Sequence, residues 1–144
     1  LTLMQNMIQK GWLGKKTNKG FYTYHGKKKT ISPEVAQYVN NFATRKLDLS
    51  KDAIQNRIVS RFVNEAVKCL EDDIIADPKV GDIGLVFGTG FAPFRGGPFR
   101  YLDTVGIGSY VDMMMTLRDE YGDQFEPCDM LKDYAKTGKT FHKH

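Results

Sequence analysis

The sequence predicts a mainly α-helical fold, and three observations point to it. Apolar residues recur at helical spacing in several segments of the second half of the chain. Ser50 and Asp77 stand where helices would begin, and Pro98 and Gly106 bracket a further short helix. One segment near the start of the chain is not predicted to be helical. Residues 21–31 show the alternation expected of a short β-hairpin that turns at His25-Gly26. We therefore expect an all-α domain of about five helices, preceded by a helix and a hairpin that belong to something else.

The first third of the chain predicts three short elements. Residues 1–11 place Leu1, Met4 and either Met7 or Ile8 on one helical face, and Gly11 ends that helix. The hairpin follows. From Ser32-Pro33 a second helix is expected to run to about Arg45.

The longest helix is expected between Ser50, as its N-cap, and Glu71. Its apolar stripe comprises Ile54, Ile58, Phe62, Val63, Ala66 and Leu70. Later helices are expected from Asp77-Pro78, from Pro98 to Gly106, over "SYVDMMMTLRDEYG", and from Pro127 through "CDMLKDYAKTG". The three methionines cannot all face one side of a helix, which favours a role in the core plus an interface.

Composition bounds the class of protein. The 144 residues, 41% of them hydrophobic, suffice for one sizeable core with a small appendage. The net charge of +4 comes from 21 basic residues interspersed with 17 acidic ones, a pattern that argues against a nucleic-acid partner. No apolar stretch approaches the roughly 20 residues of a membrane-spanning helix. Cys69 and Cys128 lack metal or redox spacing and suggest a reducing compartment.

The apolar residues 83–87 come directly before Gly88-x-Gly90. This order is typical of a strand that leads into a dinucleotide-binding turn. The third glycine of that fingerprint is replaced by Pro93, and Pro98 prevents the continuous helix that the motif requires. We therefore expect an interhelical connection instead, shaped by Gly88, Gly90, Gly96 and Gly97.

Candidates for chemistry are few. His25, His142 and His144 lack zinc spacing, so no metal site is expected, and the last two lie in a tail expected to be frayed. Lys15, Lys16 and the run 27–29 could meet a phosphate or an anionic membrane surface, or could simply be solvated turns.

Three segments resemble the C-terminal helical domain of 3-hydroxyacyl-CoA dehydrogenases. "LGKKTNKGFYTY", with Gly20 and Phe21, resembles the segment that closes this domain. "NRIVSRFVNEAVKCLED", with Asn64 and Glu65, resembles the helix that opens it. "GDIGLVFGTGFAPFRGGPFRYLDTVG" resembles its continuation; the positions that carry this part are Gly88, Gly90, Gly97, Pro98 and Asp103. The implied fold is the helical type also found in 6-phosphogluconate dehydrogenase C-terminal domains.

The closing motif precedes the opening motif, which is expected of tandem copies. The resemblance implies that residues 1–31 are the tail of a first copy, residues 32–49 a linker and helix, and residues 50–144 a second copy. Tandem copies occur in multifunctional fatty-acid β-oxidation enzymes, and details such as Gly96-Gly97-Pro98 look closest to the mitochondrial trifunctional α-subunit type. A mitochondrial location follows as an expectation.

The resemblance also implies a function. The parent would combine enoyl-CoA hydratase with NAD-dependent long-chain 3-hydroxyacyl-CoA dehydrogenase activity, with NAD bound outside this chain. Asn56 matches an asparagine that reaches the acyl-CoA substrate in the catalytic copy, but a structural role is favoured in a second copy. Asn64 and Glu65 are expected to hydrogen-bond within the core.

Two roles stay open for this part. In one it buttresses the dehydrogenase domains and contributes to subunit contacts. In the other it is an interaction module that docks a thiolase β-subunit or a membrane surface and takes no part in catalysis. The chain by itself is expected to be inactive. The apolar face of its first helix is expected either to dock residues 1–24 on the helical domain or to mediate self-association.

Overall fold

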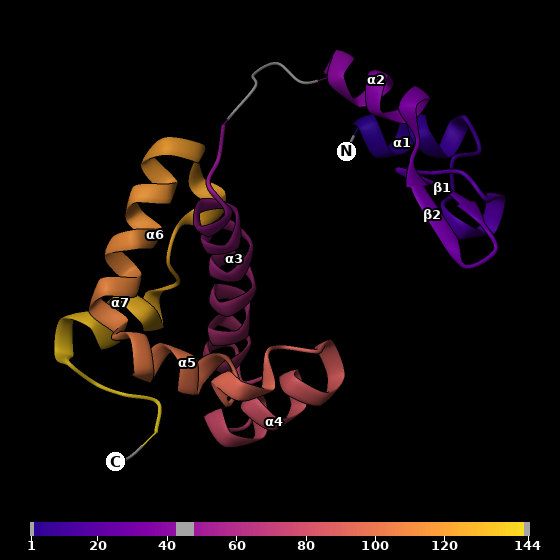
Figure 1. Cartoon of the computed structure of the whole chain (residues 1–144). Helices are drawn as coiled ribbons and strands as arrows, with labels where there is room; N and C mark the ends of the chain where they lie inside the picture. Colours follow the sequence, from indigo (N-terminus) through magenta and orange to yellow (C-terminus); the bar gives the residue numbers. More distant parts are fainter. Residues whose placement is uncertain (1, 43–47, 143–144) are drawn as a thin grey trace. The chain divides into compact units, whose positions relative to one another are not determined.

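The computed structural model describes residues 2–42 and 48–142, which form two compact units (Figure 1). Unit 1 comprises Leu1–Asp48 and unit 2 comprises Leu49–His144. Helices dominate, so the predicted fold class is confirmed.

Unit 1 contains the predicted helix and hairpin. Helix α1 spans Thr2–Gln9, and a 3-10 turn, η1, spans Lys15–Thr17. Strands β1 (Tyr22–His25) and β2 (Lys28–Ile31) pair antiparallel, with Tyr22 opposite Ile31 and His25 opposite Lys28. Helix α2 follows over Pro33–Phe42. The expected extension of this helix to Arg45 lies outside the described residues.

The small core of unit 1 joins its elements. Met7 of α1 and Val35 of α2 are buried, and the Trp12 ring meets the Tyr38 ring edge-on at 5.3 Å between centroids. Helix α2, which lies in the segment interpreted from the sequence as a linker and helix (residues 32–49), belongs to the same compact unit as the hairpin and α1. The physical reason is its apolar face, which a linker helix would leave in water.

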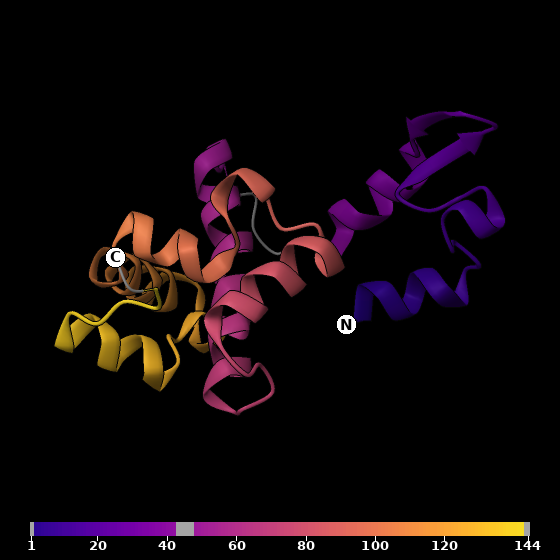
Figure 2. The same cartoon turned by 90° about the horizontal axis from the view of Figure 1, so that it is seen from below.

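Unit 2 is built on one long helix. Helix α3 spans Lys51–Glu71, α4 Pro78–Thr89, α5 Pro98–Val105, α6 Ile107–Tyr121 and α7 Asp129–Thr137. The 3-10 turns η2 (Pro93–Arg95) and η3 (Asp123–Phe125) lie in the connections. Figures 1 and 2 agree in placing α6 and α7 on one side of α3 and α4 on the other.

The helix starts follow from local chemistry. The Ser50 hydroxyl accepts a hydrogen bond from Ala53 N at 3.1 Å, and the Asp77 carboxylate accepts from Lys79 N and Val80 N at 2.8 and 3.0 Å. Both predicted N-caps are confirmed. The last helix begins at Asp129 after Cys128, two residues later than the predicted start at Pro127.

The core of unit 2 lies where α3, α5, α6 and α7 meet. Its buried members are Val63, Ala66, Val67, Phe99, Leu102, Ile107, Tyr110, Met114 and Leu131. Met114 is fully buried, while its two methionine neighbours in α6 are half-buried. The first half of the predicted α3 stripe departs from this pattern, because Ile54 and Ile58 are exposed. Among the described residues, none of the helices has both the length and the apolar character that crossing a membrane requires.

Candidate functional site

Asn56, the residue matched to a substrate-contacting asparagine, lies in a groove of unit 2. The groove encloses about 460 Å³ between the first half of α3 and the connection that leaves α4. Its lining comprises Gln55, Asn56, Ile58, Val59, Phe62, Thr89, Gly90, Phe91, Ala92, Phe94, Arg95 and Tyr101. Carboxylates, histidines and thiols, the groups that exchange protons near neutral pH, are missing from this lining. The groove is therefore suited to binding rather than to acid–base catalysis.

Aromatic rings form the floor of the groove. Phe62 stacks on Phe91 at 5.4 Å between ring centroids, and Phe91 meets Tyr101 at 6.3 Å. The Arg95 guanidinium lies 5.4 Å from the centres of the Phe94 and Tyr101 rings. Such stacking places the connection against α3 and fixes the shape of the groove.

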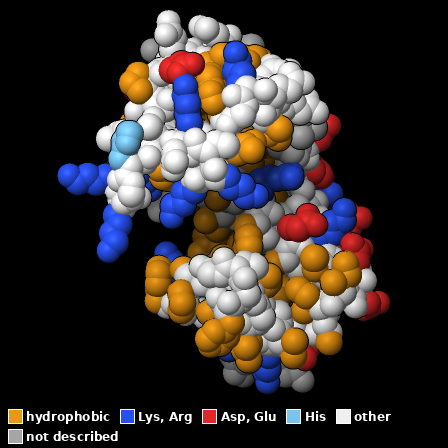
Figure 3. Space-filling view, turned by 90° about the vertical axis from the view of Figure 1, so that its right-hand side faces the viewer, with side chains coloured by type: hydrophobic (Ala, Val, Ile, Leu, Met, Phe, Trp, Pro, Cys, Tyr) orange, Lys and Arg blue, Asp and Glu red, His pale blue; other side chains and the backbone are white. Residues whose placement is uncertain are grey.

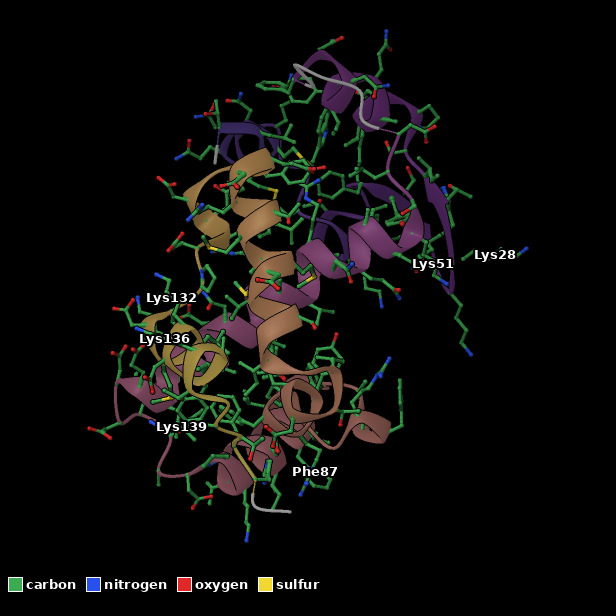
Figure 4. All side chains as sticks on the ribbon, turned by 90° about the vertical axis from the view of Figure 1, so that its left-hand side faces the viewer. Lys28, Lys51, Phe87, Lys132, Lys136 and Lys139 are labelled. Carbon is green, nitrogen blue, oxygen red and sulfur yellow. The ribbon has the colours of Figure 1, made fainter. Side chains whose placement is uncertain are left out.

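Large apolar side chains are exposed on α4 and in the lining of this groove. On α4, Val80, Ile83 and Phe87 recur at positions i, i+3 and i+7 and are 56%, 62% and 86% exposed. We call these three residues the α4 apolar face. Phe94 is 84% exposed and Ile58 66%. In Figure 3, hydrophobic side chains gather in the lower half of the view. The position of Phe87 is labelled in Figure 4. The i, i+3, i+7 spacing is readable in the sequence, but only the structure shows that this face is uncovered.

The Gly88-x-Gly90 pair does not form a dinucleotide-binding turn. Residues 78–89 are one helix, so Gly88 lies inside α4 and not, as predicted, in the connection. Gly90 ends that helix in the left-handed conformation, with φ of +77°. Without a strand before the glycines and a helix directly after them, the residues present do not fit the pyrophosphate of NAD.

A buried carboxylate organises the connection after η2. Asp82 of α4 accepts hydrogen bonds from Phe99 N at 2.8 Å and Arg100 N at 3.2 Å, at the start of α5. Gly97 passes directly over this carboxylate with φ of +110°, and any Cβ there would overlap the Asp82 side chain. Pro98 then occupies the first turn of α5, where a missing N–H costs nothing. The sequence motif singled out Gly97 and Pro98 and also contains Asp82, but it assigned no role to Asp82.

The expectation of a frayed tail is wrong for His142. Its side chain is only 5% exposed, and Nε2 lies 2.8 Å from Oδ2 of Asp82. Asp103 accepts hydrogen bonds from Phe141 N and His142 N at 2.9 and 2.8 Å. The Phe141 ring packs against Tyr134 and Phe99. These contacts between distant segments hold the tail in place. His144 lies outside the described residues.

Asn64 joins α3 to the segment before α7. Its Nδ2 donates to Glu126 O at 3.0 Å, and its Oδ1 accepts from Cys128 N at 2.9 Å. Glu71 accepts from Met130 N at 3.0 Å in the first turn of α7. Glu65 does not lie in the core as expected: its side chain is exposed at the edge of a hollow that Asp129 and Lys132 of α7 also line.

Several pKa values are shifted near this junction. Burial raises the pKa of the Cys128 thiol to about 11. Hydrogen bonds from Lys132 and Arg118 lower the pKa of Glu126. This exposed network is structural in character. Within residues 2–42 and 48–142, no cluster of three or more His, Cys, Asp or Glu side chains could hold a metal ion.

In unit 1, Gly20 is buried and a Cβ on it would lie 2.9 Å from Gly14 Cα, so the close approach of two backbones requires glycine. Phe21 is half exposed and lines an apolar hollow of about 500 Å³ with Met4, Ile8 and Trp12.

Unit 2 is a helical domain, and residues 54–144 match the family model described as "3-hydroxyacyl-CoA dehydrogenase, C-terminal domain". The chain belongs to this family. It is similar to the "Fatty acid oxidation complex subunit alpha" of Vibrio parahaemolyticus (44% identity over 136 residues, 94% of this chain and 19% of the relative). The Vibrio vulnificus protein of the same name is 45% identical over 136 residues, 94% of this chain and 19% of the relative. The Shewanella loihica protein is 43% identical over 130 residues, 90% of this chain and 18% of the relative.

These relatives correct one expectation. They come from Vibrio and Shewanella, which are bacteria without mitochondria, so the mitochondrial location is wrong. The finer likeness to the mitochondrial trifunctional type is likewise unsupported. The chain spans about a fifth of the length of the curated relatives it matches.

Proposed function

We propose that this chain is part of a fatty-acid β-oxidation enzyme with enoyl-CoA hydratase and NAD-dependent long-chain 3-hydroxyacyl-CoA dehydrogenase activities. Within that enzyme, unit 2 buttresses the dehydrogenase domains and contributes to subunit contacts. The family match and the name shared by the relatives, fatty acid oxidation complex subunit alpha, support the class of enzyme. We further propose that NAD binds outside this chain. In support, the Gly88-x-Gly90 pair lacks the preceding strand and the following helix of a dinucleotide site.

The α4 apolar face carries the structural part of this proposal. Unit 2 already has a closed core, so Val80, Ile83 and Phe87 are not needed to complete its own packing. Leaving three large apolar side chains in water on one helix is unfavourable, and burying one such side chain stabilises an assembly by roughly 1.5–3 kcal/mol. The occupant we propose is an apolar surface of the dehydrogenase part of the same enzyme.

The test uses the full-length protein and the 144-residue chain side by side. Phe87→Asp is expected to lower the thermal midpoint of the dehydrogenase part in the full-length protein while leaving the 144-residue chain nearly unchanged. Ile74→Asp is the matched control, because Ile74 is also strongly exposed but lies outside the α4 apolar face. Equal effects of the two variants in the full-length protein would contradict the buttressing role.

The role of Asn56 is tested by turnover. Because we assign Asn56 to a second domain copy, and the matching asparagine of the first copy would contact the substrate, Asn56→Ala is expected to leave dehydrogenase turnover of the full-length protein within about twofold. A hundredfold loss, equivalent to about 2.7 kcal/mol of transition-state stabilisation, would place this groove in the active site.

A second occupant of the α4 apolar face is a separate subunit, such as a thiolase β-subunit, since the relatives are named as subunits of a complex. In that case Phe87→Asp would release the subunit in size-exclusion chromatography and leave the dehydrogenase midpoint unchanged. Docking to a membrane surface would appear as vesicle binding that Phe87→Asp abolishes.

A further inference from the structure

Positive charge is concentrated in unit 1. Residues 1–48 contain nine Lys and Arg against two Asp and Glu, a net charge of +7. Residues 49–144 contain twelve basic against fifteen acidic residues, a net charge of −3. The chain total of +4 hides this division. A strongly basic segment of this kind points to an anionic partner.

Most of these lysines have no carboxylate nearby. Within residues 2–42 of unit 1, Glu34 is the one acidic side chain, and it pairs with Lys19. Lys15, Lys27 and Lys29 therefore have no carboxylate partner in the described part of unit 1. In the upper half of the view in Figure 3, Lys and Arg side chains gather with few acidic side chains between them.

Three of these lysines surround one hollow. Lys15 comes from η1, Lys27 from the hairpin turn and Lys29 from β2, and together with Tyr22, Tyr24 and Gly26 they enclose about 490 Å³. The strand register places Tyr24 directly opposite Lys29, so both side chains lie on the same face of the hairpin. Lys29 Nζ lies 4.8 Å from the centre of the Tyr22 ring.

Lys28 provides an internal comparison. It pairs with His25 in the register, so it lies on the opposite face of the hairpin from Lys29. Figure 4 shows Lys28 projecting away from β2. It adds charge to unit 1 without lining the hollow.

Backbone hydrogen bonds hold η1 against the hairpin. Tyr24 N donates to Asn18 O at 3.0 Å, and Gly14 N donates to Lys19 O at 2.8 Å. Lys15 is thereby carried on a segment tied to β1, and the three ammonium groups share one hollow although they repel one another. A ligand with several negative charges would offset that repulsion.

We propose that this hollow is a binding site for clustered phosphate groups, held by Lys15, Lys27 and Lys29. The ligand has at least two phosphates close together, carried either by a free phosphorylated metabolite or by a lipid headgroup. This site is independent of the groove and of the α4 apolar face in unit 2.

The experiment titrates the 144-residue chain with inorganic pyrophosphate in a calorimeter at constant ionic strength. Saturable binding is expected, with affinity lowered at least fivefold in Lys15→Ala, Lys27→Ala and Lys29→Ala. Lys28→Ala is expected to change it less than twofold. All four lysines are exposed, so circular dichroism should show an unchanged fold.

A vesicle arm distinguishes the two sources. Co-sedimentation with vesicles containing a phosphorylated phosphoinositide, lost in Lys29→Ala, assigns the site to a lipid headgroup. Pyrophosphate binding without co-sedimentation assigns it to a free phosphorylated ligand. The proposal is overturned if pyrophosphate does not bind, whatever the vesicles do, or if Lys28→Ala weakens binding as much as Lys29→Ala. An equal effect of Lys28→Ala would mean that pyrophosphate is attracted by the overall positive charge of unit 1 and not by the lysines that line the hollow.

Discussion

Gly97 shows how a single residue depends on a distant side chain. Its backbone has φ of +110°, and the space where a Cβ would stand is filled by the carboxylate of Asp82. That carboxylate cannot move freely, because it is hydrogen-bonded to Phe99 N and lies against His142. Position 97 therefore requires glycine for two reasons: its positive φ, and the Asp82 carboxylate that fills the space of a Cβ.

We predict that Gly97→Ala lowers the free energy of unfolding of unit 2 by at least about 1 kcal/mol. Urea denaturation monitored by circular dichroism measures this change. Gly108→Ala is the matched control, since Gly108 lies in α6 with open space around it and is expected to be neutral or slightly stabilising. A neutral Gly97→Ala would show that Asp82 does not hold its position.

Cys128 links stability to pH. Burial raises its pKa to about 11, whereas the unfolded thiol ionises near pH 8.5. The folded state therefore holds its proton more tightly, and this part of the stability is present below about pH 8.5 and is lost as pH rises towards 11.

We predict that the unfolding free energy of the wild-type chain falls more steeply between pH 8.5 and 10.5 than that of Cys128→Ala. Comparing the two proteins removes the contribution of every other titrating group they share. Urea midpoints measured at half-unit pH steps provide the test, and parallel profiles would contradict it.

At the scale of elements, the two halves of α3 differ in how far they are buried. Its second half packs into the core through Val63, Ala66 and Val67 and holds the approach to α7 through Asn64. Its first half, with Ile54 and Ile58, is exposed. The helical spacing predicted a single stripe, but it could not tell which turns other elements of the described structure would cover.

We predict that Asn64→Ala lowers the unfolding free energy by about 1–3 kcal/mol, because Glu126 O and Cys128 N lose their partner in a half-buried position. Glu65→Ala, the neighbouring exposed position, is expected to change it by less than about 0.5 kcal/mol. Chemical denaturation compares the two variants. Equal losses would mean that helix propensity, and not the Asn64 contacts, sets the effect.

For the whole molecule, the division into two units has a measurable consequence. Val35 belongs to the core of unit 1 and Leu131 to that of unit 2, and both are fully buried. We predict that Leu131→Ala, which typically costs about 2–5 kcal/mol, accelerates amide hydrogen exchange in peptides of unit 2. Peptides of unit 1 should be unaffected, and Val35→Ala should show the reverse. Faster exchange throughout the chain in either variant would mean one cooperative unit.

Self-association of the chain also stays a prediction. The apolar hollow of unit 1 is open, with Met4, Ile8 and Phe21 exposed around it. We expect a concentration-dependent sedimentation coefficient that Ile8→Glu abolishes. A wild-type chain that sediments as a monomer up to about 100 μM would rule out a dimer with a dissociation constant in the low micromolar range.

The sequence by itself determined the helical class, the hairpin, most helix boundaries and the family, because spacing, N-caps, prolines and motif order are local signals. It also contained the charge division between residues 1–48 and 49–144, which the total charge concealed. Tertiary structure alone decided that Asp82 meets the start of α5 and His142, and that Asp103 holds the tail. It also decided that α4 leaves Phe87 uncovered. These features join residues up to 60 positions apart, and local physical chemistry cannot specify which distant side chain will fill a given space.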